Sequence, residues 1–120
     1  MAIRLFFLLV IFSLYACTGP RYGEYPSPGR VEQGIASWYG SEFQGRPTSS
    51  GEIYDMFQPT AAHKTLPLGS LVRVTNLENG RWTEARINDR GPFIPGRIID
   101  LSYAGARDID IVETGTAPVE

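Results

Sequence analysis

Four polar side chains whose chemistry suits proton transfer fall in two short stretches of the sequence. Glu52, Asp55 and the chain's one histidine, His63, lie close together in the first, and Asp89 lies in the second, Asn88-Asp89-Arg90-Gly91-Pro92-Phe93. Gly and Pro punctuate this part of the chain and mark turns and loops. Carboxylates and imidazole that are gathered on loops are the groups that act as acids and bases in catalysis. The pattern therefore favours an enzyme over a purely structural domain.

Each of these residues also has a structural interpretation. Asp89 can accept N–H bonds from the turn that follows it, as aspartates often do. Glu52 can be a surface charge beside a turn, and His63 can be a buried histidine whose hydrogen bonds are satisfied. A metal centre of His63, Glu52 and Asp55 would lack a second histidine or a cysteine, so we expect no metal and no other cofactor.

Composition limits the kind of protein that positions these residues. A chain of 120 residues allows one domain with appendages. The formal net charge of −2 offers no basic surface, so we expect no nucleic-acid partner. The 13 glycines and 9 prolines require many turns, which favours an all-β or loop-rich fold.

The N-terminus has the pattern of an export signal. Arg4 is followed by an apolar run from Leu5 to Leu14, which is too short to span a bilayer but fits the apolar core of a signal peptide. The run ends in Leu14-Tyr15-Ala16-Cys17, which resembles a bacterial lipobox. We therefore predict a signal peptide over residues 1–16 and a lipid-modified Cys17 that anchors the chain to a membrane. The alternatives are an ordinary cleaved signal with an unpaired thiol, or an uncleaved anchor.

A tether and one folded domain follow. Residues 17–32 carry several Gly and Pro residues and no hydrophobic periodicity, which predicts a flexible connection. Residues 33–120 are the predicted domain. Thr18, rather than Asp, follows the cysteine, and by resemblance to other bacterial lipoproteins this favours the outer membrane, with the domain facing the periplasm.

Short alternating segments predict the strands of that domain. Val72 and Val74 alternate with polar neighbours, and Glu78-Asn79-Gly80 is a hairpin turn signal. Ser102 is suited to begin a short helix. We expect about six strands and one helix in a small barrel, with strands at Val31–Trp38, Leu71–Asn76, Arg81–Asn88, Arg97–Leu101 and Ala117–Glu120 and the helix at about Tyr103–Val112.

A series of short motifs, in order from about Gly34 to Pro118, resembles the rare lipoprotein A family. The motifs are Ala36-Ser37-Trp38-Tyr39-Gly40, Gly45-Arg46-Pro47-Thr48, Ser50-Gly51-Glu52, Tyr54-Asp55, Thr60-Ala61-Ala62-His63-Lys64-Thr65-Leu66-Pro67-Leu68-Gly69, Val74-Thr75-Asn76-Leu77, Asn79-Gly80, Asn88-Asp89-Arg90-Gly91-Pro92-Phe93 and Ile99-Asp100-Leu101-Ser102. The resemblance implies a six-stranded double-psi β-barrel with one or two short helices. It also implies an endolytic lytic transglycosylase that cleaves peptidoglycan glycan strands, preferring strands stripped of stem peptides.

Such an enzyme uses no water. One acid protonates the glycosidic oxygen and, as the conjugate base, takes the proton from the sugar's own primary hydroxyl, which closes an anhydro ring. By the resemblance, Asp89 is the first candidate for this group and Glu52 the second. His63 is expected to orient or tune the site, and Asp55 to support it or contact the substrate.

Further residues are expected to bind the glycan. Trp38 and Phe93 offer flat rings to apolar sugar faces, with barrel core or rim as the structural alternative for both. Lys64 or Arg90 is expected to pair with the free lactyl carboxylate of stripped muramic acid.

Two other functions remain open. Expansins share this type of barrel and loosen walls without cutting them, so one alternative is a non-catalytic glycan-binding lipoprotein. A scaffold that contacts envelope proteins is the other. Because relatives continue past the position of Glu120, we also expect a short closing strand and an open barrel edge.

Overall fold

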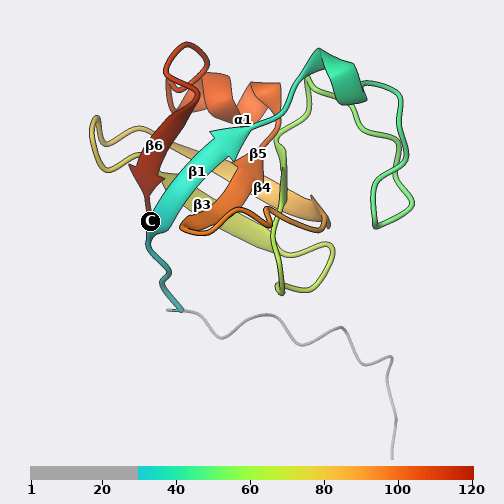
Figure 1. Cartoon of the computed structure of the whole chain (residues 1–120), viewed down its shortest axis with the longest axis horizontal. Helices are drawn as coiled ribbons and strands as arrows, with labels where there is room; N and C mark the ends of the chain where they lie inside the picture. The colour runs from blue at the N-terminus through green and yellow to red at the C-terminus, as the bar shows by residue number, and fades with distance from the viewer. Residues whose placement is uncertain (1–29) are drawn as a thin grey trace, which may run out of the picture.

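The computed structural model describes residues 30–120, so the predicted signal peptide, Cys17 and the first part of the tether lie outside the described residues. A six-stranded sheet curls around one hydrophobic core, with a short α-helix packed beside it (Figure 1). The elements are β1 (Gly34–Trp38), the 3-10 turn η1 (Ser41–Phe43), β2 (Thr60–Ala62), β3 (Leu71–Thr75), β4 (Trp82–Asp89), β5 (Arg97–Leu101), α1 (Tyr103–Asp108) and β6 (Thr116–Val119). No helix among these residues is long and apolar enough to cross a membrane.

The strands follow the order β3-β4-β2-β5-β1-β6 across the sheet. β1 pairs with β5 and β2 with β4 in parallel, and the other neighbouring pairs are antiparallel. Parallel neighbours need long crossover connections, so these pairings bring together segments that are distant in the sequence. The arrangement confirms the predicted all-β fold, a six-stranded double-psi β-barrel with a short α-helix and a 3-10 turn.

The core is built largely from small side chains. In β4, Thr83, Ala85 and Ile87 are buried while Trp82 and Glu84 are exposed, as the alternation predicted. Small residues allow strands to curl tightly and to approach the helix closely. Alanines enter the core from four strands and from α1: Ala36, Ala61, Ala85, Ala106 and Ala117.

Sequence and structure agree best for long alternating segments. The bounds of β5 are as predicted, whereas β1 begins at Gly34 rather than Val31 and α1 ends at Asp108 rather than Val112. The prediction did not locate β2 or η1, because three residues are too few to show a period. The omission matters, since β2 lies between β4 and β5 in the sheet.

The expected open edge is present along only part of β3. Thr75 N donates to Glu120 O (2.9 Å), and Thr75 O accepts from Glu120 N (3.0 Å). Leu77 N donates to Pro118 O (2.9 Å). These bonds join the end of β6 to the end of β3, so the expectation of an open edge is wrong there. Along 71–74 no described strand pairs with the outer side of β3, and a cavity of about 640 Å³ opens between β3 and β5.

Candidate active site

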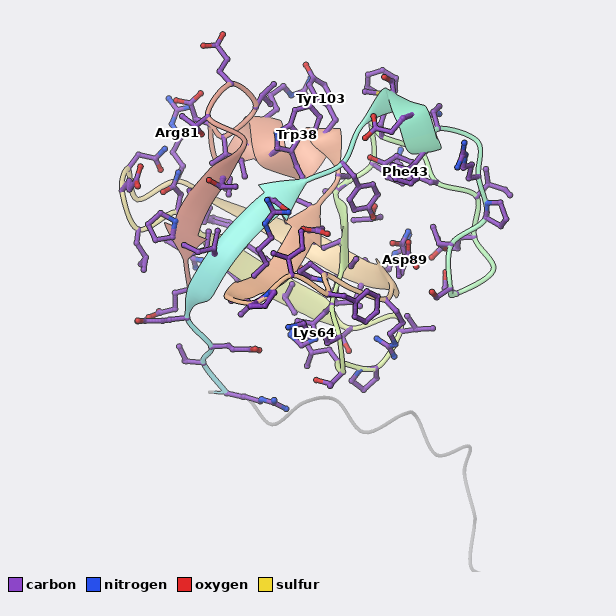
Figure 2. The ribbon with its side chains drawn as sticks, viewed as in Figure 1. Trp38, Phe43, Lys64, Arg81, Asp89 and Tyr103 are labelled. Carbon is purple, nitrogen blue, oxygen red and sulfur yellow. The ribbon has the colours of Figure 1, made fainter. Side chains whose placement is uncertain are left out.

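Asp89, the first candidate of the sequence analysis, ends strand β4 and lines a cavity of about 240 Å³. Figure 2 shows it between the end of β4 and the loop that follows η1. Most of the cavity's side chains are aromatic or charged. They are Tyr39, Phe43, Arg46, Pro47, Thr48, Tyr54, Ala62, Asp89, Arg90 and Asp100.

One oxygen of Asp89 is fully engaged. Oδ1 accepts hydrogen bonds from Ser49 N (3.0 Å), Ser49 Oγ (2.7 Å) and Arg90 N (2.9 Å). The bond from Arg90 N is the contact that the structural interpretation of Asp89 predicts, so Asp89 does cap the turn that follows it. No described residue bonds Oδ2, so that oxygen is the one available to exchange a proton with a substrate.

Arg90 does not pair with the Asp89 carboxylate. Its Nη1 donates to the carbonyl oxygens of Leu66 (2.6 Å) and His63 (3.2 Å), so the guanidinium fixes the loop that follows β2. A guanidinium that caps two carbonyls has less capacity for a substrate carboxylate. Arg90 lines the cavity, but its described bonds are structural.

Glu52 is placed by a turn and held by an ion pair. Gly51 has a positive φ of 86°, and the turn it permits is closed by Thr48 N donating to Glu52 O (2.7 Å). The Glu52 carboxylate pairs with Arg86 and accepts from Ser50 Oγ (3.1 Å). The hydrogen bond from Arg86 lowers the pKa of Glu52, so the group is anionic at neutral pH. It does not line the Asp89 cavity.

His63 is buried, and its ring lines the larger cavity beside β3 rather than the Asp89 cavity. Nδ1 accepts from Thr65 N (3.1 Å) and Leu66 N (3.0 Å), and Nε2 lies 3.1 Å from Glu32 Oε2. An imidazole with Nδ1 as acceptor carries its proton on Nε2, facing Glu32. The backbone N of His63 donates to Asp89 O (3.1 Å), so His63 contacts Asp89 through its main chain and not through its ring.

The other predicted binding residues are spread over the surface. Figure 2 shows Trp38 beside Tyr103, while Lys64 directly follows His63, whose backbone N donates to Asp89 O. The Trp38 and Tyr103 ring centroids are 5.9 Å apart, and Asp55 Oδ1 caps Phe57 N (3.0 Å). Lys64 is exposed. Phe93 is 81% exposed. The Asp89 cavity is lined by none of these four residues, Trp38, Asp55, Lys64 and Phe93.

Sequence reasoning missed a second carboxylate in the cavity. Asp100 lies in β5, and its register partner Ala62 in β2 is also the partner of Asp89 in β4. On the other side of β5, Asp100 pairs with Ser37 of β1, whose hydroxyl donates to its Oδ1. The motif Ile99-Asp100-Leu101-Ser102 held the residue, but only the sheet order brings it level with Asp89.

Tyr39 supplies a neutral hydroxyl to the same cavity. Burial, with neighbouring Tyr54, Asp89 and Asp100, raises its pKa well above the ordinary value, so the phenol stays protonated. Burial also raises the pKa of Tyr54, whose hydroxyl donates to Tyr39 O (2.8 Å). The Thr60 hydroxyl lies near Tyr39 Oη, but the pair misses hydrogen-bond geometry and both oxygens lack partners among the described residues.

The arrangement suits proton transfer without a metal ligand set. Within residues 30–120, no three His, Cys, Asp or Glu side chains gather as metal ligands do. The cavity instead combines two carboxylates, a protonated phenol and an exposed cation, Arg46. These groups can protonate, deprotonate and orient an uncharged polyol or a glycan.

The sequence is similar to a family model and to several curated proteins that share one name. A family model described as "Lytic transglycolase" matches residues 31–120. The chain is 58% identical over 106 residues to the "Endolytic peptidoglycan transglycosylase RlpA" of Vibrio cholerae, covering 88% of this chain and 40% of that protein. Proteins of the same name match from Pseudomonas aeruginosa (59% over 87 residues, 72% and 26% covered) and Helicobacter pylori J99 (55% over 102 residues, 81% and 32% covered). The chain thus spans less than half the length of these relatives.

A solved structure supports the fold independently. The Streptomyces papain inhibitor superposes with a TM-score of 0.61 over 76% of this chain and 91% of its own, at 23% identity. At that identity the likeness concerns the fold alone. The family match over three quarters of the sequence, together with relatives at more than 50% identity, shows that the chain belongs to the lytic transglycolase family and is RlpA-like.

Proposed function

We propose that this protein is an endolytic peptidoglycan lytic transglycosylase, which cleaves glycan strands and leaves anhydromuramic ends. The observation that carries the proposal is the Asp89 carboxylate, which lines a cavity with one oxygen held in place and the other oxygen without a described partner. The names of the relatives support the same reaction class.

The reaction needs two proton movements at one sugar. A carboxylic acid gives its proton to the glycosidic oxygen as the C1–O bond breaks, and a carboxylate takes the proton from the primary hydroxyl as its oxygen bonds to C1. No water enters, so the product is a 1,6-anhydro ring and a new free hydroxyl on the leaving strand. We assign the transfer to Asp89 Oδ2, and the hydrogen bonds that hold Oδ1 support it, because a fixed carboxylate favours catalysis by orientation.

Glu52, the second candidate for the acid, is poorly suited to that role. Its ion pair with Arg86 keeps it anionic and outside the cavity. A general acid must be protonated and within reach of the leaving oxygen. We therefore assign the proton transfer to Asp89 and give Glu52 a positioning role.

Three finer features belong to the proposal. We expect a preference for strands without stem peptides, because the cavity is small and a peptide on the lactyl group would have to pass its rim. We also expect lipid on Cys17 and a site at the outer membrane facing the periplasm, on the lipobox and on Thr18. The two expectations about lipid and membrane rest on the sequence pattern of residues 1–18.

A specific observation keeps a second function open. The capped Oδ1 of Asp89 is also what a purely structural aspartate would show. In that case the domain would bind glycan and loosen the wall without cutting it.

Mass spectrometry of products distinguishes the two functions. The full chain in detergent is incubated with naked glycan strands and with strands that carry stem peptides. We expect anhydromuramic-ended fragments from the naked strands and at least a hundredfold less product from Asp89→Asn, with binding retained. Binding without any product from the wild type would establish the non-catalytic function, and reducing ends would mean hydrolysis by water.

A further inference from the structure

The row of side chains that crosses the sheet at Ala62 places two carboxylates on one face. Across β4, β2 and β5 the register partners are Asp89, Ala62 and Asp100. Neighbouring strands are about 4.8 Å apart, so the Cα atoms of the two aspartates are separated by about 10 Å. All three residues line the same cavity. The methyl group of Ala62 leaves the space between the carboxylates unfilled.

This spacing suits a glycosidic bond. Paired carboxyl groups that flank a scissile glycosidic bond lie roughly 5–9.5 Å apart. Two side chains that rise from the same face of a sheet, with Cα atoms about 10 Å apart, can present their oxygens within that range. A sugar that enters over Ala62 would therefore meet Asp89 on one side and Asp100 on the other.

The two carboxylates have different surroundings. Asp89 Oδ1 accepts from three donors, and two of them are backbone N–H groups, which can only donate. Asp100 has one described partner, the hydroxyl of Ser37. A hydroxyl can donate to a carboxylate or accept from a carboxylic acid, so Ser37 accommodates both protonation states of Asp100.

We infer that Asp100 is a second catalytic residue, which protonates the glycosidic oxygen while Asp89 accepts the proton of the primary hydroxyl. The inference rests on the proposed function and divides its two proton movements between two groups. Asp100 loses its proton as the C1–O bond breaks, and Asp89 gains one as the primary oxygen bonds to C1. Exchange with solvent after product release restores both groups, so no further reactant is needed.

Other charged or titratable groups near Asp100 are few. Tyr39, Tyr54, Arg46, Arg90 and Asp89 line its cavity. Its strand neighbours Ser37 and Ala62 do not titrate.

Helix α1 also packs against β5 and carries three such groups. Tyr103 lies beneath the Arg107 guanidinium, at 5.8 Å from its ring centroid, and Asp108 accepts from Thr83 Oγ1 (2.8 Å). Arg107 and Asp108 thus have partners of their own, and neither lines the cavity.

Separate residues for the acid and the base predict a specific pH dependence of kcat/KM. An acid must be protonated and a base deprotonated, so kcat/KM on naked glycan strands should follow a bell-shaped curve. Asp100→Asn in the full chain should lower kcat/KM by about 10²–10⁴-fold and remove the fall at high pH. Asp89→Asn should remove the fall at low pH. Asp108→Asn is the matched control, because it too is an aspartate bonded to one hydroxyl, and it should leave the curve unchanged.

A milder variant covers the chance that Asp100→Asn does not fold, which circular dichroism and the thermal transition would reveal. Ser37→Ala keeps the Asp100 carboxyl but removes its described hydrogen-bond partner, so kcat/KM should fall by about 10-fold while both limbs of the pH curve remain. Wild-type levels of kcat/KM in folded Asp100→Asn, or in Ser37→Ala, would overturn the role of Asp100. Absence of anhydro product from the wild type would overturn the proposed function and this role together.

Discussion

Glu52 has a positioning role in the proposed reaction, and its contacts show how it could act without carrying the proton. Its ion pair with Arg86 ties the turn that contains Ser49 to strand β4, and Ser50 N donates to Asn88 O (3.1 Å) beside it. Ser49 in turn gives two hydrogen bonds to Asp89. Loss of the ion pair should therefore loosen the donors that orient the Asp89 carboxylate.

A charge exchange tests this positioning role. Glu52→Gln is expected to lower kcat/KM by roughly 10- to 100-fold, because small displacements of catalytic groups are costly. Both limbs of the pH curve should persist. Glu52→Arg combined with Arg86→Glu restores an ion pair of reversed polarity and should recover part of the lost activity. If Glu52 carried the proton, the double variant would be as inactive as the single one.

The ion pair also has its own pH dependence. The hydrogen bond from Arg86 lowers the pKa of Glu52 in the folded state. A lowered pKa means that the pair contributes above the ordinary glutamate value and is lost as pH falls through the lowered one. Because both side chains are about 41% exposed, the contribution to stability is small.

The sequence identified one of the two carboxylates in the cavity. Asp89 follows the predicted strand Arg81–Asn88 and precedes Gly91-Pro92, which is a recognisable setting for a functional loop residue. Asp100 lies inside a strand, where an alternating carboxylate resembles a solvent-facing position. Its proximity to Asp89 depends on the register with Ala62, which is a property of the sheet and not of local sequence.

At the scale of elements, the decisive strand is the one that was hardest to predict. β2 spans only Thr60–Ala62, and two of its residues are alanines, which are depleted in strands. The long strand β4 shows a clear period, because one of its faces is buried and the other is exposed. Nothing local in the sequence specifies that β2 lies between β4 and β5, since both pairings are non-local. The site could therefore be predicted only in part.

Ser102 links β2 to helix α1 and offers a test at this scale. Its buried hydroxyl donates to Gln58 O (2.6 Å) and accepts from Thr60 N (3.2 Å) and, as the predicted helix cap, from Gly105 N (3.3 Å). Ser102→Ala removes all three bonds, although Thr60 N keeps its bond to Gln58 O (3.0 Å), and should lower the free energy of unfolding by about 1–3 kcal/mol. Urea denaturation measures the change.

The control for this prediction is an exposed serine. Ser41 begins η1 and makes no described side-chain hydrogen bond, so Ser41→Ala should change stability by less than about 0.5 kcal/mol. Equal effects of the two substitutions would show that the hydroxyl of Ser102 does not hold the helix to β2.

For the whole molecule, the important question is how completely the barrel closes. β6 pairs along β1 and then meets β3 only at its last residues, where Thr75 and Glu120 exchange two hydrogen bonds. Farther along β3 the large cavity separates it from β5, and His63 and Glu32 face that space. The cavity lined by Asp89 shares no lining residue with this one, so the incompletely closed seam is separate from the proposed active site.

Hydrogen exchange distinguishes the closed end of β3 from the open seam. In an antiparallel pair, successive N–H groups alternate between the two sides of a strand. Thr75 N points to Glu120, so the amides of Arg73 and Leu71 point to the same outer side, where no described strand receives them. The Thr75 amide should exchange at least tenfold more slowly than those of Arg73 and Leu71, while Val72 and Val74, which face β4, are protected. Strong protection of Arg73 and Leu71 would mean that another segment pairs with β3 in solution and that the seam is closed.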